Sequence, residues 1–152
     1  MFTKLSGIAA TLRVALLLTF VGSAQAEMPK IELTAGMHRI EAEVAATQQN
    51  RMVGLMNRKA MAGHQGMLFV FDQENTHCMW MRNTLIPLSV AFLDGDGVIL
   101  NVEEMQPQTE DNHCARRPAR YALEMNRGWF AQRGLAAGNR INGLQRAPVP
   151  RP

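Results

Sequence analysis

The stretch LSVAFLDGDGVILNVEEM, residues 88–105, carries the clearest structural signal in this chain of 152 residues. An apolar run over residues 88–93 follows Pro87, and a second segment that fits a strand covers residues 98–105. Between them lies Asp94-Gly95-Asp96-Gly97, a dense group of turn-forming residues. We therefore predict two antiparallel strands that are joined by a tight turn.

Two more strands are predicted near the start of the domain. Residues 31–33 alternate between apolar and polar side chains, and residues 38–45 do so again, with Ile40, Ala42 and Val44 on one side. A period of two is typical of half-buried strands. Ala35-Gly36 separates the two segments and predicts a hairpin turn.

One helix is predicted over residues 48–56, because Thr47 is a suitable N-cap and apolar residues then recur at helical spacing. Further strands are predicted at residues 67–71, 76–82 and 121–124, a brief helix at 126–133, and a turn into a closing strand at 138–141. The expected fold class is α+β. We expect a small β-rich domain with a curled antiparallel or barrel-like sheet and one or two short helices.

Residues 1–26 have the pattern of a cleavable secretory signal peptide. Lys4 and Arg13 give a basic start, residues 14–21 an apolar run, and Ala24-Gln25-Ala26 a cleavage pattern. An uncleaved anchor is the alternative, but the run is shorter than the roughly 20 apolar residues that span a bilayer. We expect a single domain over 27–146, a disordered tail over 147–152, no membrane span after cleavage, and a periplasmic or secreted location.

The charge of the chain argues against nucleic acid as a partner. The signal segment holds two basic residues and no acidic one, so its removal lowers the net charge from +3 to +1. This balance is too small to attract a polyanion. The one basic cluster, Arg116, Arg117 and Arg120, is interpreted as a solvated loop.

Cys78 and Cys114 are the only cysteines, and both follow the signal segment. An even pair in an oxidising compartment predicts a disulfide, which would be worth roughly 3–4 kcal/mol by chain-entropy arguments. The alternatives are free thiols and a metal site that adds the adjacent His77 and His113. The metal alternative is disfavoured because neighbouring residues of a strand point to opposite faces.

No standard catalytic signature is present, so the catalytic residues, if there are any, stay unknown. The chain lacks a Ser-centred nucleophile elbow, a phosphate-binding glycine loop and a zinc-protease motif. Methionines are spread through the mature domain and are expected mostly in the core, although thioethers also line adaptable pockets and bind Cu(I). They are Met52, Met56, Met61, Met67, Met79, Met81, Met105 and Met125. We expect neither a cofactor nor a resident metal.

The segment Trp80-Met81-Arg82-Asn83-Thr84 is the best candidate for a ligand site. A large aromatic beside a charge and a carboxamide can frame a ligand. Arg58 and Glu124 are charged residues among apolar neighbours and could supply a polar anchor. The structural alternative is that Trp80 is core, Asn83 ties down a turn, and an Arg–Glu pair is buried.

Several blocks occur in a fixed order along the chain. They are Arg51-x-x-Gly54-Leu55-Met56-x-Arg58, Gly66-Met67-Leu68-Phe69-x-Phe71, Trp80-Met81-Arg82-Asn83-Thr84-x-x-Pro87-Leu88, Asp94-x-x-Gly97, Met105-x-Pro107 and Pro118-x-x-Tyr121-Ala122-Leu123-Glu124. Over roughly residues 31–144 the chain resembles the domain of unknown function 192 family. The resemblance implies a compact β-rich domain, often exported or membrane-tethered, without an established activity. Many relatives have an aromatic residue where this chain has Met79, and the cysteines belong to a subset of the family.

These observations favour a non-enzymatic exported domain that binds a small molecule or an envelope component at Arg58, Trp80, Asn83 and Glu124. One alternative is a hydrolase of envelope saccharide or peptide, which needs Glu124 and Asp72 or Asp94 in one cleft. The other alternative is copper handling, in which a histidine and at least two methionines converge.

Overall fold

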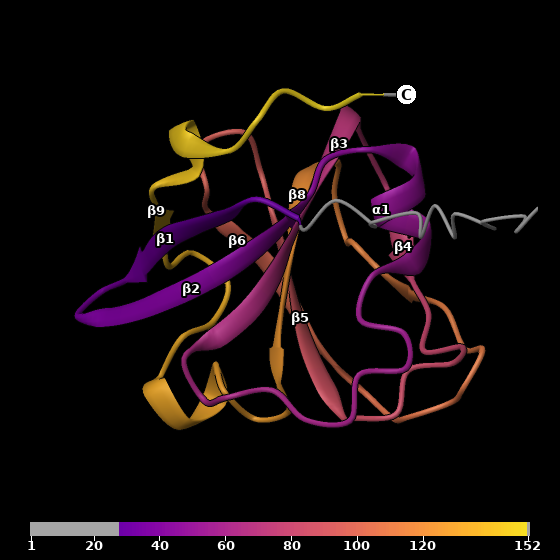
Figure 1. The fold of residues 1–152 in the computed structure, drawn as a ribbon. Helices are drawn as coiled ribbons and strands as arrows, with labels where there is room; N and C mark the ends of the chain where they lie inside the picture. Colours follow the sequence, from indigo (N-terminus) through magenta and orange to yellow (C-terminus); the bar gives the residue numbers. More distant parts are fainter. Residues whose placement is uncertain (1–27, 152) are drawn as a thin grey trace, which may run out of the picture.

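The computed structural model describes residues 28–151 (Figure 1). The signal peptide expected over residues 1–26 lies outside the described residues. The strands are β1 (Lys30–Ala35), β2 (His38–Ala45), β3 (Gln65–Asn75), β4 (Cys78–Met79), β5 (Leu88–Leu93), β6 (Ile99–Met105), β7 (His113–Cys114), β8 (Ala119–Asn126) and β9 (Ile141–Asn142). The helical segments are α1 (Gln48–Val53) and the 3-10 turns η1 (Ala131–Arg133) and η2 (Leu144–Arg146).

The hairpin predicted at residues 88–105 is confirmed. β5 and β6 pair antiparallel from Leu88 opposite Met105 to Leu93 opposite Ile99. Asp94 fixes the turn, because its Oδ1 accepts hydrogen bonds from the backbone N–H groups of Asp96 and Val98, at 3.0 and 2.9 Å. The hairpin at the start of the domain is also present, since β1 and β2 pair antiparallel.

Seven strands form one sheet in the order β6-β5-β8-β3-β2-β1-β9, and β4 and β7 form a separate two-stranded ladder. The expectation of a wholly antiparallel sheet is wrong at one position, because β2 and β3 run parallel. A parallel pair needs a long crossover. Residues 46–64, which include α1, provide that crossover and return the chain to the same end of the sheet.

The sheet curls, and its outer edges are joined at one end. β9 pairs with β1, and the residues just before it bond to the residues that lead into β6. The N–H of Ile99 donates to the carbonyl of Asn139 at 2.8 Å, and the N–H of Ile141 donates to that of Gly97 at 2.9 Å. The curled, barrel-like sheet predicted from the sequence is therefore present.

Apolar side chains cover both faces of this sheet. In β3, Leu68 and Val70 belong to one buried cluster, whereas Met67, Phe69 and Phe71 belong to a second. The second cluster lies on the face that carries α1 and the β4–β7 ladder, and it also contains Leu55 and Met81. Two covered faces explain why β5 is buried along its whole length.

The domain is less helical than the expected α+β class. Only α1 is an α-helix among residues 28–151, and it ends at Val53 instead of continuing to residue 56. It stops because Gly54 takes a φ of +48°, and its N–H closes the last turn on the Asn50 carbonyl. The helix predicted at residues 126–133 is a 3-10 turn between Gly128 and Gly134, which both have positive φ. The fold is therefore mostly β.

The end of the chain, predicted as a disordered tail over residues 147–152, is described as far as Arg151. The Arg151 N–H donates to the Ala46 carbonyl at 2.7 Å, and the Gln48 N–H donates to the Arg151 carbonyl at 3.2 Å. These contacts place the tail beside the start of α1. No helix in residues 28–151 combines the length and apolar character that a membrane crossing requires.

Candidate functional site

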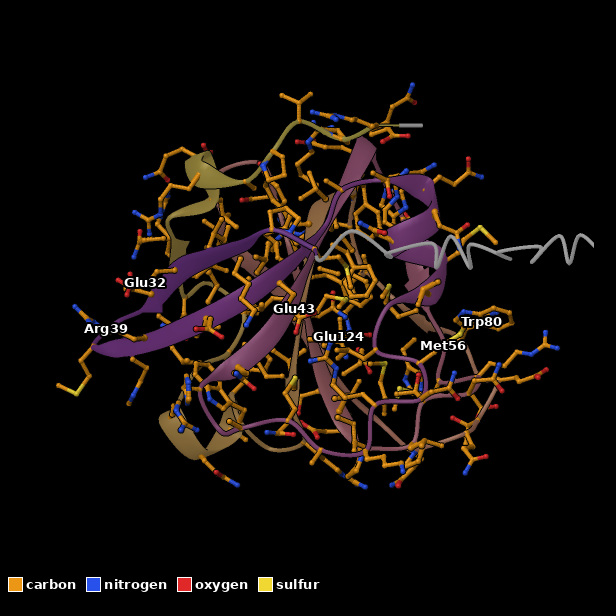
Figure 2. The ribbon with its side chains drawn as sticks, viewed as in Figure 1. Glu32, Arg39, Glu43, Met56, Trp80 and Glu124 are labelled. Carbon is orange, nitrogen blue, oxygen red and sulfur yellow. A yellow bond between two sulfur atoms is a disulfide. The ribbon has the colours of Figure 1, made fainter. Side chains whose placement is uncertain are left out.

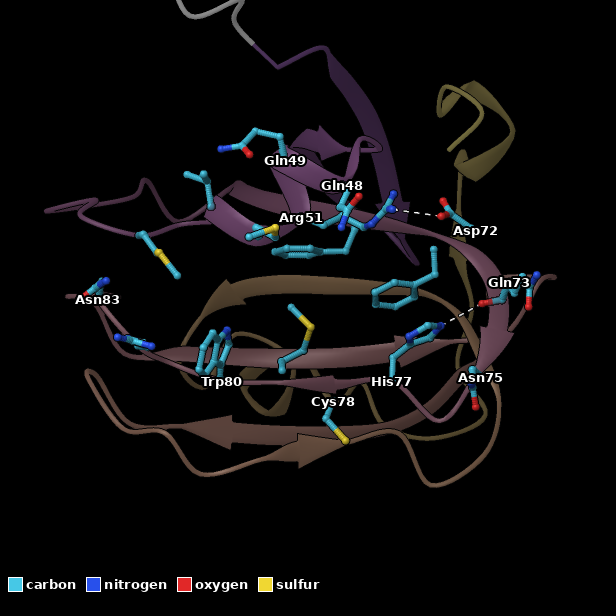
Figure 3. Close-up of a pocket in the computed structure, with 17 residues that line it drawn as sticks. Gln48, Gln49, Arg51, Asp72, Gln73, Asn75, His77, Cys78, Trp80 and Asn83 are labelled. Carbon is cyan, nitrogen blue, oxygen red and sulfur yellow. Dashed lines mark hydrogen bonds and ion pairs between the residues drawn. The ribbon is translucent and has the colours of Figure 1, made fainter. Parts of the chain in front are cut away.

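A cleft of about 920 Å³ lies between α1 and the β4 segment (Figure 3). We call it the α1–β4 cleft. Its lining residues are Gln48, Gln49, Arg51, Met52, Val53, Met56, Phe69, Phe71, Asp72, Gln73, Asn75, His77, Cys78, Met79, Trp80, Arg82 and Asn83. The volume is in the range of pockets that hold small organic ligands.

The α1 wall presents polar and apolar side chains to the cleft, and the apolar ones are Met52 and Val53. The Thr47 side chain accepts a hydrogen bond from the Asn50 N–H at 3.1 Å and so begins the helix. Six helical residues cannot bury a full apolar face, and none of the α1 residues is buried. Met52 is 62% exposed although it is apolar.

The floor of the cleft comes from β3 and the far wall from β4. Phe69 and Phe71 project from β3 and are largely buried in the second apolar cluster. Met79 and Trp80 come from the β4 segment, and Trp80 is 45% exposed. Aromatic and thioether side chains therefore face one another across the cleft.

Arg51 fixes α1 to the sheet and is not available as an anchor. Its Nη1 donates to the carbonyls of Ala46 and Val70, at 2.9 and 3.1 Å, and its Nη2 donates to Asp72 Oδ2 at 3.2 Å. Asp72 is therefore already paired where it reaches the cleft. The pair holds the spacing between α1 and β3.

His77 is held across the cleft from Arg51, just before β4. Its ring stacks on Phe71 with centroids 3.7 Å apart, and its Nε2 lies 2.9 Å from the Gln73 carbonyl oxygen. This packing orients the turn between β3 and β4. It also places His77 in the same cleft as Met52, Met56 and Met79, the residue types of the copper alternative.

The rim of the cleft is rich in carboxamides. Five of them line it: Gln48, Gln49, Gln73, Asn75 and Asn83. Each carboxamide offers both a donor and an acceptor. Within residues 28–151 no hydrogen bond joins the side chain of Gln48, Gln49, Gln73 or Asn83 to another residue. These groups suit a ligand that carries polar groups as well as an apolar body.

A side-chain contact and a backbone turn shape the rim beside Trp80. The Arg82 guanidinium lies 5.6 Å from the centroid of the Trp80 ring, within cation–π distance. Asn83 has a φ of +57°, and its carbonyl accepts a hydrogen bond from Asn57, which also has a positive φ. Asn tolerates this left-handed conformation better than most residues. Asn83 therefore ties down the turn, as its structural alternative predicted, while it also lines the cleft.

The four residues predicted as ligand-binding do not meet at one place. Trp80 and Asn83 line the α1–β4 cleft, whereas Arg58 and Glu124 are not among its lining residues. In Figure 2, Glu43 and Glu124 lie over the middle of the sheet, and Trp80 and Met56 lie toward α1. Whether any of the four binds a ligand stays a prediction.

Arg58 forms an ion pair with a residue that the sequence pattern did not single out. Its two terminal nitrogens donate to the two carboxylate oxygens of Glu43, at 2.6 and 2.8 Å. Both side chains are mostly buried, so the pair joins the loop after α1 to β2. This is an Arg–Glu pair, but with Glu43 in place of Glu124.

Glu124 lies in β8 and is only 4% exposed. Its neighbours in the adjacent strands are Met67 and Val90. Burial raises the pKa of Glu124 to about 8, because the charged carboxylate loses its hydration. Glu124 is therefore mainly protonated at neutral pH.

The carboxylates of the hydrolase alternative are not brought together in the α1–β4 cleft. Asp72 lines it, Asp94 fixes the β5–β6 turn, and Glu124 lies under the second apolar cluster. Among residues 28–151 no group of three or more His, Cys, Asp and Glu side chains could hold a metal ion. The disulfide predicted between Cys78 and Cys114 is present.

The α1 side of the site was not predicted from the sequence. Gln48, Gln49 and Met52 fit the pattern of an amphipathic helix, and methionines were expected mostly in the core. The signal that could have found them is the early Gly54, which limits α1 to a length that cannot bury Met52.

Comparison with known proteins places this chain among uncharacterised proteins. The model of a family described as DUF192, Uncharacterized ACR, matches residues 31–143. A protein of unknown function from Novosphingobium aromaticivorans is 28% identical with a TM-score of 0.75, covering 79% of this chain and 89% of its own. A protein described as a proposed transcription regulator from Sinorhizobium meliloti is 34% identical with a TM-score of 0.69, covering 75% of this chain and 92% of its own. No curated protein matches the chain.

Proposed function

The chain belongs to the DUF192 family, and we propose that it is an exported binding protein whose ligand, a small molecule or an envelope component, occupies the α1–β4 cleft. One observation carries the proposal. Met52 and Trp80, 62% and 45% exposed, face the same cleft above a floor of phenylalanines. Large apolar side chains that gather in one hollow mark a binding site more often than scattered ones do.

The lining supports a ligand with an apolar body and polar groups at its periphery. Covering about 100 Å² of apolar lining would contribute about 2.5 kcal/mol. The carboxamides of the rim would then bond the polar groups of the ligand without a charge requirement. Methionine side chains are flexible, so Met52, Met56 and Met79 could adjust to ligands of different shapes.

Binding is favoured over catalysis by the state of the reactive groups in the cleft. Asp72 is paired with Arg51, His77 is packed on Phe71, and Cys78 is in a disulfide. A nucleophile would need a neighbouring base within hydrogen-bond reach. No such pair is found among the described lining residues.

Binding of the apolar dye 1-anilinonaphthalene-8-sulfonate, measured by fluorescence titration, tests this function. We expect Met52→Glu and Trp80→Ala each to weaken binding about tenfold or more, because the first places a charge against the dye and the second removes a ring. The control is Met37→Glu in the β1–β2 turn, where Met37 is 90% exposed and does not line the cleft. Equal binding by all three variants and the parent chain would reject the cleft as the site.

Export is part of the proposal, and the Cys78–Cys114 disulfide supports it because disulfides persist in oxidising compartments. Expression of the full chain in a bacterium with a periplasm, followed by N-terminal sequencing, tests it. A mature chain that starts at Glu27 is expected. A cytoplasmic chain that still starts at Met1 would contradict export.

Cu(I) is a second candidate ligand, because three thioethers and His77 line the same cleft. A double variant, Met52→Leu with Met79→Leu, keeps the apolar volume and removes two sulfur ligands. Copper binding predicts that this variant loses Cu(I) to a bathocuproine competitor while it still binds the dye. Unchanged Cu(I) affinity would exclude the two thioethers as ligands.

A further inference from the structure

The β4 segment has one bonded edge and one open edge. β4 pairs with β7 through Cys78 opposite Cys114 and Met79 opposite His113, and with no other strand of residues 28–151. The Cys78 and Cys114 Cα atoms are 4.0 Å apart, the close spacing of a pair that does not exchange backbone hydrogen bonds. The adjacent pair, His77 and Ala115, does exchange a backbone hydrogen bond, as an antiparallel ladder requires. The Ala115 N–H donates to the His77 carbonyl at 2.9 Å.

In an antiparallel pair, successive residues direct their backbone N–H and C=O groups alternately toward the partner strand and away from it. His77 and Met79 direct their bonding groups toward β7, so Cys78 directs its N–H and C=O away from β7. Trp80 follows β4, which ends at Met79. In the described part of the chain, no backbone hydrogen bond involves the N–H or C=O of Trp80. Cys78 in β4 and Trp80 just after it therefore leave their backbone N–H and C=O groups unpaired among the described residues.

The open edge belongs to the α1–β4 cleft. The cleft is lined by residues 77–80 on one side and α1 on the other, and neither residue of β7 lines it. Figure 3 shows the Cys78 side chain pointing away from α1. Cys78 therefore lines the cleft through its backbone, because its sulfur is bonded to Cys114.

From this geometry we infer that the occupant of the α1–β4 cleft is an extended polypeptide segment that pairs with the open edge of β4. The inference rests on the proposed binding function and names the class of its ligand. Peptides that add to a sheet edge obtain affinity from backbone hydrogen bonds and specificity from pockets for alternate side chains. The α1–β4 cleft offers both unpaired backbone groups and an apolar lining that can receive side chains.

The spacing of the edge fits a peptide better than a compact small molecule. Cys78 and Trp80 are two residues apart, a separation that spans about 6.6–6.8 Å where the backbone is extended. Residues i and i+2 of an extended peptide have the same spacing. One face of such a peptide would meet Met52, Met56 and Phe69, and the rim carboxamides could bond the backbone groups that β4 does not reach.

The disulfide has a clear role in this arrangement. A two-residue ladder has few hydrogen bonds of its own, so β4 would fray without another tie. The Cys78–Cys114 bond fixes β4 to β7 and so keeps the open edge in place before a peptide arrives. A preorganised edge reduces the entropy that is lost on binding.

The test uses a library of octapeptides with randomised apolar residues at alternate positions and threonine between them. Peptides retained by the purified mature chain but not by Met52→Glu are identified by mass spectrometry. The tightest is then made in two N-methylated forms, one with methyl groups on each set of alternate nitrogens. Only one set faces β4, so we expect one form to bind about tenfold more weakly or worse and the other to bind as before.

Amide hydrogen exchange gives a second readout on the protein. The N–H groups of Cys78 and Trp80 are expected to exchange fast in the unbound chain and to slow at least tenfold with the peptide, whereas the N–H of Met79 already faces β7 and changes little. Equal binding by both N-methylated forms, or no protection at Cys78 and Trp80, would overturn the edge-pairing inference. No retained octapeptide, with dye binding intact, would overturn it as well and leave the cleft as a small-molecule site. Loss of both would reject the proposed function itself.

Discussion

Glu124 is the residue whose chemistry departs furthest from its ordinary state. It lies in the central strand β8. Met67 of β3 lies opposite Glu124 on one side and opposite Glu43 of β2 on the other, and Glu43 is already ion-paired with Arg58. Because burial raises the pKa of Glu124 from 4.5 to about 8, the native state keeps a proton that the unfolded state releases above about pH 4.5. The stabilisation from this proton is complete below pH 4.5 and is lost as the pH rises toward 8.

We therefore predict that the free energy of unfolding falls between about pH 5 and pH 8, by up to about 1.4 kcal/mol per pH unit from this group. Glu124→Gln, which is neutral at every pH, should remove most of that slope. Urea unfolding at pH 5, 6, 7 and 8 measures it. The exposed Glu74→Gln serves as control and should keep the parent slope. The same slope in Glu124→Gln would show that Glu124 does not titrate in this range.

Some features of single residues followed from the sequence and others did not. The Cys78–Cys114 pairing could be predicted because only two cysteines exist. The partner of Arg58 could not, because Glu43 and Glu124 both lie in strands and only the register decides which carboxylate the loop after α1 reaches. Trp80 and Asn83 could be picked out from the sequence because they lie in a dense block of aromatic and polar residues. Both residues line the α1–β4 cleft.

At the scale of elements, the β4–β7 ladder depends on its disulfide. The ladder has two paired residues on each strand, and the bond closes a loop that spans 36 positions in sequence. Loops of this size are worth roughly 3–4 kcal/mol when they are closed. The disulfide is therefore the main interaction that holds β4 in position.

We predict that the double variant Cys78→Ser with Cys114→Ser unfolds at lower urea concentration, with a loss of roughly 3–4 kcal/mol. Binding of the dye should weaken too, because β4 forms one wall of the cleft. Unfolding curves and dye titrations check both effects. A variant that loses stability but binds the dye as tightly as the parent would mean that the β4 wall does not contribute to the site.

The prediction of elements succeeded where a local signal dominates. The β5–β6 hairpin has an apolar run, a second strand-like segment and a turn fixed by Asp94 within 18 residues, so local sequence decides it. The length of α1 was overestimated because Met52, Leu55 and Met56 keep helical spacing past Gly54. The close approach of Phe69 to Gly54 leaves little room for a side chain at this position. A Cβ at Gly54 would lie 3.2 Å from Phe69 Cζ, a tertiary contact that no local pattern shows.

At the scale of the whole molecule, the joining of β9 to the start of β6 closes the curled sheet. Gly97 has a φ of +82°, and a Cβ there would collide with the Ile141 carbonyl oxygen and lie 2.8 Å from Leu144 Cδ1. The backbone of Gly97 also accepts the N–H of Ile141. Glycine is needed at this position both for its conformation and for the close approach.

We predict that Gly97→Ala destabilises the domain by about 2 kcal/mol or more. Gly36→Ala is a matched control: Gly36 also has a positive φ, +57°, but a Cβ added there would meet no atom within 4 Å. It should cost about 1 kcal/mol, from backbone strain alone. Thermal or urea unfolding compares the two. Equal losses would show that the contact between residues 97 and 141 does not hold the sheet closed.

The global arrangement was only partly accessible from sequence. Alternation and short apolar runs predicted strands, and the number and shortness of these strands predicted a curled β-rich sheet. The order β6-β5-β8-β3-β2-β1-β9 and the parallel β2–β3 pair depend on which strands meet over long separations. The α1–β4 cleft arises from that same topology, since residues 48–53 and 77–80 meet only after the crossover is made.

The methionines of the chain can report directly whether the α1–β4 cleft is the ligand site. Met52, Met56 and Met79 line the cleft, Met67 is fully buried in the core, and Met37 is 90% exposed in a distant turn. The measurement is a titration of the chain, labelled with ¹³C at its methionine methyl groups, with 1-anilinonaphthalene-8-sulfonate. If the cleft is the ligand site, the signals of Met52, Met56 and Met79 will shift with one common dissociation constant while those of Met37 and Met67 stay in place. Shifts at Met37 or throughout the core, with the three cleft signals unmoved, would contradict it.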